Sequence, residues 1–347
     1  MVLHTGATRG PPGVELEHLP GLPDLAREAG AASKAAWHLR DQWRPAVHVA
    51  LKRQLRRFRP DVVHTHHPQG LSAAVFTAIS ACDLPHAHTA HDANAVCARI
   101  TMTREGHFCG GRCLSCRPQR LTRVPLQRRS LGRLIAPSDY FRDLYVRAGV
   151  VSADRAQTIR QGAQPGTARL RRIDPARGLV VGYLGALADH KGVPTLLRAF
   201  GSAPATWKLR IAGYGALEAE LSQAAARDSR LEFAGLVAGG RKDAFLDSLD
   251  VLVIPSEYEE NAPLVAVEAA IRGLPTVVSD RGGLPETAEA TVFRAGDATG
   301  LLDGLAQLAG DDGLLAGRSR RLLDARERFS WPTHMQRVEG TLQELAG

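Results

Sequence analysis

The sequence predicts an α/β protein built from two doubly wound domains, each with a parallel sheet. Short apolar segments typical of buried strands alternate with helical patterns from about residue 61 onward. A stretch over 162–178 is rich in Gly, Pro and Arg and has little apolar pattern, so we interpret it as a linker. With 347 residues, the chain is long enough for two domains with separate cores. We therefore expect an N-terminal domain over 1–165 and a C-terminal domain over 179–329.

The first part of the chain is weakly patterned and leads into one amphipathic helix. Residues 2–4 are typical of the end of a strand, and residues 13–19 alternate like a short strand. A helix is predicted over about 35–58, because its apolar residues share one face while Arg and Lys occupy the others. We favour a core-facing helix with a basic solvated face, and a membrane-surface helix is the alternative. The apolar residues are Trp43, Val47, Leu51, Leu55 and Phe58.

The rest of the first domain follows a strand–helix rhythm. Ser138 is expected to be the N-cap of the helix that follows it. In a parallel sheet the ligand site lies at the carboxyl ends of the strands, where His66 and His91 are predicted. The predicted strands cover 61–66, 86–92 and 134–138, and the predicted helices cover 69–81 and 139–148.

The second domain has the same rhythm with clearer turns, because glycines separate most of its elements. Its predicted strands cover 179–184, 207–212, 231–234, 251–254, 275–279 and 292–293. Its predicted helices cover about 193–201, 215–226, 241–248, 263–272, 299–309, 312–328 and 331–345.

Composition and charge limit the classes of partner. The chain carries 44 Lys and Arg against 36 Asp and Glu, a net charge of +8. This balance fits phosphorylated substrates, an anionic membrane surface or nucleic acid. Aromatic residues are only 5%, too few for base stacking, so we expect no nucleic-acid partner. The sequence has no apolar run of 18 residues and no signal pattern, which predicts a cytoplasmic protein. A peripheral location on the inner face of the plasma membrane is a further hypothesis.

Two carboxylates bracket a predicted helix start in the second domain. Glu260 and Glu268 are separated by an Asn-Ala-Pro turn and an apolar helix, after a strand that ends at Ile254. If both were helical they would lie roughly 12 Å apart. The N–H groups and dipole of a helix start favour an anion between them. The pair therefore matches a ligand with hydroxyls at both ends and phosphates in the middle, and two solvated Glu residues are the alternative.

Two glycine turns are predicted at the same edge of this sheet. Gly185 follows a strand, and Lys191-Gly192 stands just before a helix, so backbone N–H groups and Lys191 can hold a pyrophosphate. The Gly282-Gly283 pair lets the backbone approach a ligand closely. The alternative for Lys191 is an exposed lysine at a helix start, and the alternative for the Gly282-Gly283 pair is an ordinary strand-to-helix turn.

Together these motifs resemble the retaining nucleotide-sugar glycosyltransferases of family 4, which have the GT-B fold of two Rossmann-like domains. The resemblance covers about residues 55–345. Its motifs are Asp61-Val62-Val63-His64-Thr65-His66, His91-Asp92, Gly185 with Lys191-Gly192, Gly213-Tyr214-Gly215, Pro255-Ser256 with Glu260-Asn261-Ala262-Pro263-Leu264 and Glu268-Ala269, Gly273-Leu274-Pro275, and Gly282-Gly283-Leu284-Pro285-Glu286.

The resemblance implies a metal-independent hexosyl transfer from a UDP- or GDP-sugar to a glycan or lipid-linked acceptor in cell-surface polysaccharide synthesis. Glu260 would face the sugar hydroxyls, Lys191 the diphosphate, and Glu268 the ribose. The implied helix over 331–347 would return to the first domain. The implied catalytic residues are His91, Lys191 and Glu260, and the implied donor-binding residues are Gly185, Lys191, Ala262, Pro263, Leu264, Val265 and Glu268.

The chain departs from the family pattern at its start and after Gly185. Family members open with a strand and a Gly-rich loop, and we expect this sequence to begin near the second strand, so that the first domain lacks its first strand. The alternative function is therefore a non-catalytic sugar-nucleotide-binding remnant. Ala186 stands where the family often has a basic residue, which leaves the phosphates to Lys191 and helix dipoles.

Four of the five cysteines lie close together in the first domain, after His91. Their spacing is C-x₁₁-C-x₃-C-x₂-C, which is typical of a tetrahedral zinc site. We favour a structural zinc over an iron–sulfur cluster or four unliganded thiols. The predicted ligands are Cys97, Cys109, Cys113 and Cys116.

Overall fold

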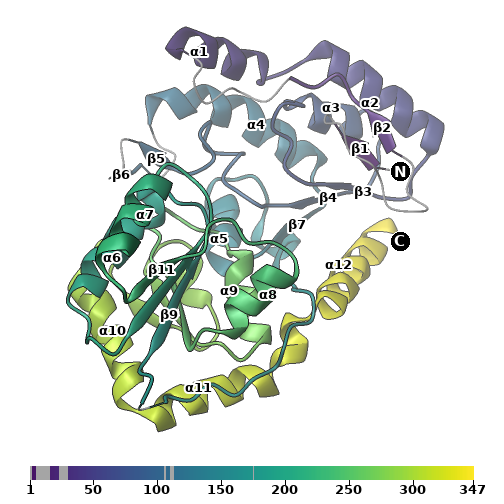
Figure 1. Cartoon of the computed structure of the whole chain (residues 1–347). Helices are drawn as coiled ribbons and strands as arrows, with labels where there is room; N and C mark the ends of the chain where they lie inside the picture. The colour runs from purple at the N-terminus through teal and green to yellow at the C-terminus, as the bar shows by residue number, and fades with distance from the viewer. Residues whose placement is uncertain (1, 5–15, 23–29, 105–106, 110–112, 175) are drawn as a thin grey trace. The chain divides into compact units, whose positions relative to one another are not determined.

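A computed structural model describes residues 2–4, 16–22, 30–104, 107–109, 113–174 and 176–347 (Figure 1). The described chain divides into two compact units. Unit 1 takes in the described residues up to 104 together with 109–159 and 338–347, and unit 2 takes in 107–108 and 160–337. Within the described ranges, no helix combines the length and apolar character needed to cross a membrane.

Unit 1 is built on a parallel sheet of four strands in the order β3-β4-β7-β8. A separate parallel pair, β1 with β2, precedes it. Ser138 caps α5 by accepting a hydrogen bond from the backbone N–H of Phe141, as predicted. The strands are β1 (Val2–His4), β2 (Leu16–His18), β3 (Val63–Thr65), β4 (His86–Thr89), β5 (Thr103–Arg104), β7 (Arg133–Ala136) and β8 (Ala156–Thr158). The helices are α1 (Ala31–Arg40), α2 (Pro45–Phe58), α3 (Ala74–Ser80), η1 (Leu114–Cys116), α4 (Arg117–Ser130), α5 (Asp139–Arg147) and η2 (Ala153–Arg155).

The single helix predicted over 35–58 is wrong, because the structure has two helices, α1 and α2, with a break between them. Pro45 starts α2 at a position where its missing N–H costs nothing. A residue before proline is pushed out of the helical region, and Arg44 accordingly has φ −130° and ψ 115°. Trp43 and Phe58, expected on the buried face, are each 44% exposed. The α2 residues Val47, Leu51 and Leu55 are buried, as expected.

A buried ion pair ties the α1–α2 break to α4. The Arg123 guanidinium donates to Asp41 Oδ2 at 2.5 Å, and both side chains are almost completely buried. Arg123 also donates to Asn94 Oδ1 at 2.7 Å. A buried charge requires such partners, so these contacts fix the position of α4 beside the segment that follows β4.

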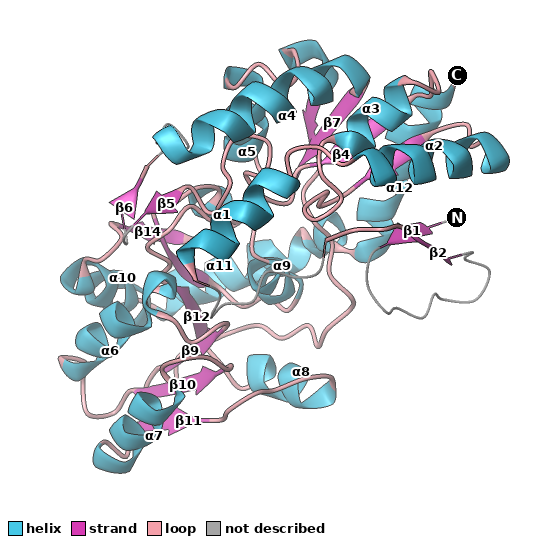
Figure 2. Cartoon of the chain, turned by 90° about the horizontal axis from the view of Figure 1, so that it is seen from above, coloured by secondary structure: helices cyan, strands magenta, loops and turns pink. Residues whose placement is uncertain are grey.

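Unit 2 is built on a six-stranded, all-parallel sheet in the order β11-β10-β9-β12-β13-β14, most of which Figure 2 labels. All six predicted strands are present, with ends within one residue of the prediction. The strands are β9 (Val180–Leu184), β10 (Lys208–Ala212), β11 (Leu231–Phe233), β12 (Val251–Ile254), β13 (Thr276–Ser279) and β14 (Thr291–Phe293), and the short strand β6 (His107–Phe108) is also assigned to this unit. The helices are η3 (Asp189–Lys191), α6 (Val193–Gly201), α7 (Glu218–Arg227), α8 (Gly240–Asp247), α9 (Leu264–Ile271), η4 (Leu284–Glu286), α10 (Ala298–Gly310), α11 (Asp312–Asp324), η5 (Arg326–Phe329) and α12 (Trp331–Ala346).

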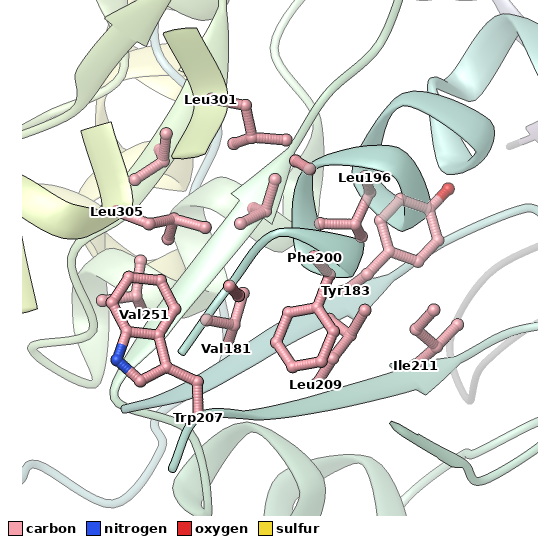
Figure 3. Packing of buried hydrophobic residues seen from close by; sticks show 14 of the residues in the cluster. Val181, Tyr183, Leu196, Phe200, Trp207, Leu209, Ile211, Val251, Leu301 and Leu305 are labelled. Carbon is pink, nitrogen blue, oxygen red and sulfur yellow. The ribbon is translucent and has the colours of Figure 1, made fainter. Parts of the chain in front are cut away.

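Helices cover both faces of this sheet, which is the doubly wound arrangement. Figure 3 shows one face, where Leu196 and Phe200 of α6 and Leu301 of α10 pack against strand residues such as Val181 and Leu209. On the other face, residues of α8 and α9 pack against the alternate strand positions. Because side chains alternate along a strand, the continuous apolar run at 251–254 supplies both cores at once.

The segment 160–178 and helix α12 also have defined partners. Arg171 is buried and donates to the carbonyl oxygens of Asp247 and Leu249 at 2.7 Å, within unit 2. Residues of α12 from Val338 onward belong to unit 1. There, Val338 packs on Ile135 and Ile159 in a small apolar cluster.

Candidate active site

The candidate donor site of unit 2 centres on the carboxylate of Glu260. Glu260 lies in the loop between β12 and α9, and only 7% of the residue is exposed. The hydroxyl of Ser256 donates to Oε1 at 2.6 Å, and the hydroxyl of Tyr258 donates to Oε2 at 2.8 Å. Lys191 completes the set, with Nζ 2.9 Å from Oε1. A buried carboxylate requires such partners, and here they also fix its orientation.

Backbone geometry brings Lys191 to this carboxylate. Lys191 ends the 3-10 turn η3 after β9, and the next residue, Gly192, has φ +73°. A Cβ atom on Gly192 would lie 1.9 Å from the carbonyl oxygen of Pro255, so only glycine permits the two loops to meet. The N–H of Glu257 also donates to the carbonyl of His190 at 2.9 Å. The loop after β9 is therefore fastened to the loop after β12.

The Gly282-Gly283 turn supports the same carboxylate residue from another side. Gly282 has φ +59°, and a Cβ there would lie 2.0 Å from the backbone oxygen of Glu260. The N–H of Gly283 donates to that oxygen at 2.8 Å. The close approach predicted for this glycine pair is thus made to the backbone of Glu260, so the turn positions the site residue.

Tyr258 forms hydrogen bonds with both Lys191 and Glu260. Its hydroxyl accepts a hydrogen bond from Lys191 Nζ at 2.8 Å while donating to Glu260, and Nζ lies 4.5 Å from the ring centroid. Burial, together with the charge of Glu260, raises the pKa of Tyr258 well above its ordinary value. The phenol therefore stays protonated at neutral pH and remains a donor to Glu260.

The other residues predicted to bind the donor lie at α9 and just after β9. Ala262 lies in the loop before this helix, Pro263 is its N-cap, and Leu264 and Val265 form its first turn, where N–H groups lack intrahelical partners. Glu268 is in the same helix and pairs with Lys242 of α8 at 2.5 Å, separately from the Lys191–Glu260 pair. Gly185 follows β9, and its N–H donates to the carbonyl of Ala212 at 3.1 Å.

Unit 1 places histidines at the carboxyl ends of β3 and β4. His91 Nε2 lies 2.8 Å from His66 Nδ1, and the two rings are stacked with centroids 5.1 Å apart. Next to them, His67 forms an ion pair with Asp92, and this hydrogen bond raises the pKa of His67. This pair is a second candidate site, within unit 1, and it follows the carboxyl ends of β3 and β4, where the sequence predicted His66 and His91.

Two further histidines lie inside the unit 1 sheet. Burial lowers the pKa of His86 to about 3 and lowers that of His88 well below its ordinary value. Both rings bond the hydroxyl of Thr65, at 2.8 and 2.9 Å. They are therefore neutral core residues that support β3 and β4, and the sequence analysis gave them no role.

The four clustered cysteines converge next to the start of α4. Cys113 Sγ lies 3.2 Å from Cys116 Sγ, which lies 3.8 Å from Cys97 Sγ. Cys109 Sγ faces the backbone oxygen of Met102 at 3.1 Å. All five cysteines of the chain are free thiols. In the part of the chain that the structure describes, no three His, Cys, Asp or Glu side chains form a ready-made metal site.

Sequence reasoning missed three supporting residues in unit 2. Ser256 stands in the quoted motif without a role and Tyr258 lies between it and Glu260, although both hydroxyls bond Glu260. Lys242, the partner of Glu268, was not singled out. The alternation of hydroxyl residues with Glu260 just after a strand is a signal for the first two. No local signal points to Lys242, because its contact joins two helices.

Comparison with known proteins gives two family matches that together span most of the chain. The model described as "Glycosyltransferase Family 4" matches residues 5–165, and that described as "Glycosyl transferases group 1" matches residues 178–311. A phosphatidyl-myo-inositol mannosyltransferase of Mycobacterium leprae is 27% identical over 94% of this chain and 85% of that protein. An uncharacterized 42.6 kDa protein in the cps region of Klebsiella pneumoniae is 24% identical, and this match covers 73% of this chain and 66% of that protein.

A solved structure has the same fold. The crystal structure of Anabaena HepE in complex with UDP has a TM-score of 0.71 at 20% identity, covering 95% of this chain and 86% of that one. Two α/β units built on parallel sheets, with this likeness, have the GT-B fold. The chain belongs to glycosyltransferase family 4.

Proposed function

We propose that the chain transfers a hexose, with retention of anomeric configuration, from a UDP- or GDP-sugar to a glycan or lipid-linked acceptor in cell-surface polysaccharide synthesis. The observation that carries the proposal is the contact between Lys191 and Glu260 just before the first turn of α9. The cation and the helix N–H groups can bind a phosphate, and the buried carboxylate can accept hydrogen bonds from the hydroxyls of a sugar.

In the proposed donor complex each part of the nucleotide sugar meets a different group. Glu260 accepts hydrogen bonds from the sugar hydroxyls, with the orientation that Ser256 and Tyr258 impose. Lys191 and the N–H groups over 262–265 bind the diphosphate, and Gly185 permits its close approach. Glu268 accepts hydrogen bonds from the ribose hydroxyls, which requires Lys242 to share it.

The proposed reaction replaces the bond from the anomeric carbon to the phosphate oxygen with a bond to the acceptor oxygen. The acceptor hydroxyl attacks from the face that the nucleoside diphosphate leaves, and its proton passes to the departing phosphate oxygen. Lys191 stabilises the negative charge that develops there, and for this reason we propose that no metal cofactor is needed. On the acceptor side, His91 would contact the reacting groups with His66 holding its ring.

Two relatives support the acceptor class. One is named for mannosyl transfer to a phosphatidyl-myo-inositol, and another is encoded in a cps region. We do not favour the non-catalytic remnant, because the Lys191–Glu260–Tyr258 network is complete.

A thermal-shift screen of the purified chain tests the donor. We expect UDP or GDP, and one of their hexose conjugates, to raise the melting temperature, because a ligand that binds the native state stabilises it. At about 100 times Kd the gain is about 2.7 kcal/mol, a shift of a few degrees for a chain of this size. Incubation with the stabilising sugar nucleotide and glycan or lipid acceptors then tests transfer. A chain that no nucleotide stabilises would contradict the proposal.

Replacing Lys191 with alanine is expected to weaken UDP or GDP binding about 10- to 100-fold. The reason is the loss of a charge-assisted hydrogen bond to the diphosphate, worth about 1.5–3 kcal/mol. Isothermal titration calorimetry measures the affinity. Lys208→Ala is the matched control, because Lys208 is exposed at the opposite, amino end of the unit 2 sheet. Equal affinities for the two variants would remove Lys191 from the phosphate site.

We also propose that α2 contacts an anionic membrane surface. Its exposed side carries Arg53, Arg56 and Arg57 together with Val49, which is 66% exposed. Such a face combines charge attraction with shallow apolar insertion.

Vesicle sedimentation at low salt tests this membrane contact. The pair Arg53→Glu and Arg56→Glu is expected to lower binding to anionic vesicles at least tenfold, since each basic residue contributes about 1 kcal/mol. The control pair is Arg227→Glu with Arg241→Glu, which makes the same charge change at exposed sites of unit 2. Absence of binding by the unmodified chain, or equal loss in both pairs, would contradict the proposal.

A further inference from the structure

The four clustered cysteines of unit 1 have an arrangement that the donor chemistry does not use. They come from the 20 positions 97–116, just before α4, and the sulfur of Cys116 lies within 3.8 Å of those of both Cys97 and Cys113. Cys97 and Cys116 are both 1% exposed and belong to the apolar core of the unit. Thiols have weak hydrogen-bonding capacity, so hydrogen bonding alone does not account for the gathering.

We propose that Cys97, Cys109, Cys113 and Cys116 bind one structural zinc ion. The site forms when each thiol releases its proton and its sulfur becomes a ligand of Zn²⁺, giving a tetrathiolate complex of net charge −2 and four protons. No oxidant or other reactant is required.

The sulfur geometry is close to what tetrahedral zinc needs. With Zn–S bonds of about 2.3 Å, two sulfurs on a tetrahedron are about 3.8 Å apart. The 3.8 Å separation of Cys97 and Cys116 matches this edge. The 3.2 Å separation of Cys113 and Cys116 is shorter, so the partly exposed Cys113 side chain must move outward by a few tenths of an ångström. Cys109 must turn from the Met102 carbonyl toward the other sulfurs.

The surroundings favour the negative charge of such a site. Cys116 is the N-cap of α4, a helix of 14 residues whose positive dipole end faces the cluster. Backbone N–H groups of Met102 and Arg99 approach the sulfur of Cys97, and that of Ala98 approaches Cys116. Amide donors of this kind form the outer shell that orients and stabilises metal-bound thiolates.

The site's position gives the ion a role in unit 1. The N–H of Cys97 donates to the carbonyl of Ala93 at 2.8 Å, and the N–H of Asn94 donates to Asp92 Oδ1 at 2.6 Å. The segment that holds the first ligand is thus joined by hydrogen bonds to the turn after β4 that contains His91 and Asp92. Zinc would fasten this segment to the start of α4, and so would hold the ring of His91 in place. Only this last statement rests on the proposed function.

Metal analysis of the full chain, purified without chelators, tests the site. We expect about one zinc per chain, and cobalt substitution should give the intense visible bands of a tetrahedral tetrathiolate. Cys113→Ser should lose zinc, because removing one ligand weakens the complex, and Cys113 is exposed enough for the variant to fold. Cys82→Ser, which changes the fifth cysteine outside the cluster, should keep it.

Three results would overturn the proposal, and none depends on enzymatic activity. The first is less than about a tenth of a zinc per chain together with failure to take up cobalt. The second is a Cys113–Cys116 disulfide in mass spectra of the non-reduced chain, which would make the pair a redox couple. The third is stoichiometric iron with a coloured chromophore. Retention of zinc with loss of nucleotide stabilisation would instead count against the proposed function alone.

Discussion

Replacing Glu260 with glutamine is expected to lower sugar transfer about 100-fold or more while UDP or GDP binds as tightly as before, or more tightly. The carboxylate is proposed to accept hydrogen bonds from the sugar hydroxyls, and each charge-assisted bond contributes about 1.5–3 kcal/mol. The nucleotide does not use these bonds. Moreover, Lys191 is paired with Glu260 at 2.9 Å in the structure, and the amide would free its charge for the diphosphate.

The measurement is kcat/KM for transfer beside calorimetric affinity for the free nucleotide. Glu259→Gln is the matched control, because Glu259 is the neighbouring residue, is also 7% exposed, and has its nearest cation, Arg281, at 3.8 Å. It should keep transfer within a few-fold. If the Glu260 variant loses nucleotide affinity in parallel with transfer, Glu260 acts on the fold of the loop and the proposed sugar contact is wrong.

The second large effect is a loss of unit 1 stability when the pH falls below about 6.5. His86 and His88 are buried in β4, and burial lowers the pKa of His86 to about 3 and that of His88 well below its ordinary value of 6.5. In the unfolded chain both rings bind a proton near pH 6.5, so the unfolded state holds more protons below that pH. Stability therefore decreases as the pH falls, by about 1.4 kcal/mol per pH unit for each ring. From pH 7 to pH 5.5 the loss from these two rings is about 2–3 kcal/mol, and it is partly offset by His67, whose raised pKa favours the folded state as the pH falls.

Hydrogen exchange, corrected for the intrinsic pH dependence, locates this effect. Peptides covering β3 and β4 should lose protection, and peptides covering β12 and β13 of unit 2 provide the internal reference. NMR titration supplies a second test, in which the His67 ring titrates above its ordinary range because its hydrogen bond to Asp92 raises its pKa. Protonation of His86 or His88 near pH 6.5, or equal loss of protection in both units, would contradict this account.

The fold was largely predictable because its signals are local. The apolar run at 251–254 and the glycines that follow the strands of unit 2 indicate where its strands and helices lie along the chain, without knowledge of the tertiary contacts. The split between α1 and α2 was also encoded, in Pro45, but the amphipathic pattern across it obscured the signal. Periodicity describes which face is apolar and does not describe where the backbone stays helical.

The supporting contacts of the candidate site were less predictable, because they join distant segments. Lys191 meets Tyr258 and Glu260 only after two loops cross, and the requirement for Gly192 comes from the carbonyl of Pro255. The pairing of Glu268 with Lys242 depends on how α8 and α9 pack. The spacing of residues in the sequence predicted the candidate site residues, and the structure adds the side chains and backbone groups that orient them.

Helix α12 has a consequence for the order in which the molecule forms during translation. Unit 1 includes residues 338–347, and Val338 covers Ile135 and Ile159. At a synthesis rate of about 5–20 residues per second, these last residues follow residue 159 by about 10–40 s. Throughout that interval the nascent first unit keeps an uncovered apolar surface beside β7, while all of unit 2 emerges. Unit 1 therefore gains its last packing contacts only after all of unit 2 has been synthesised.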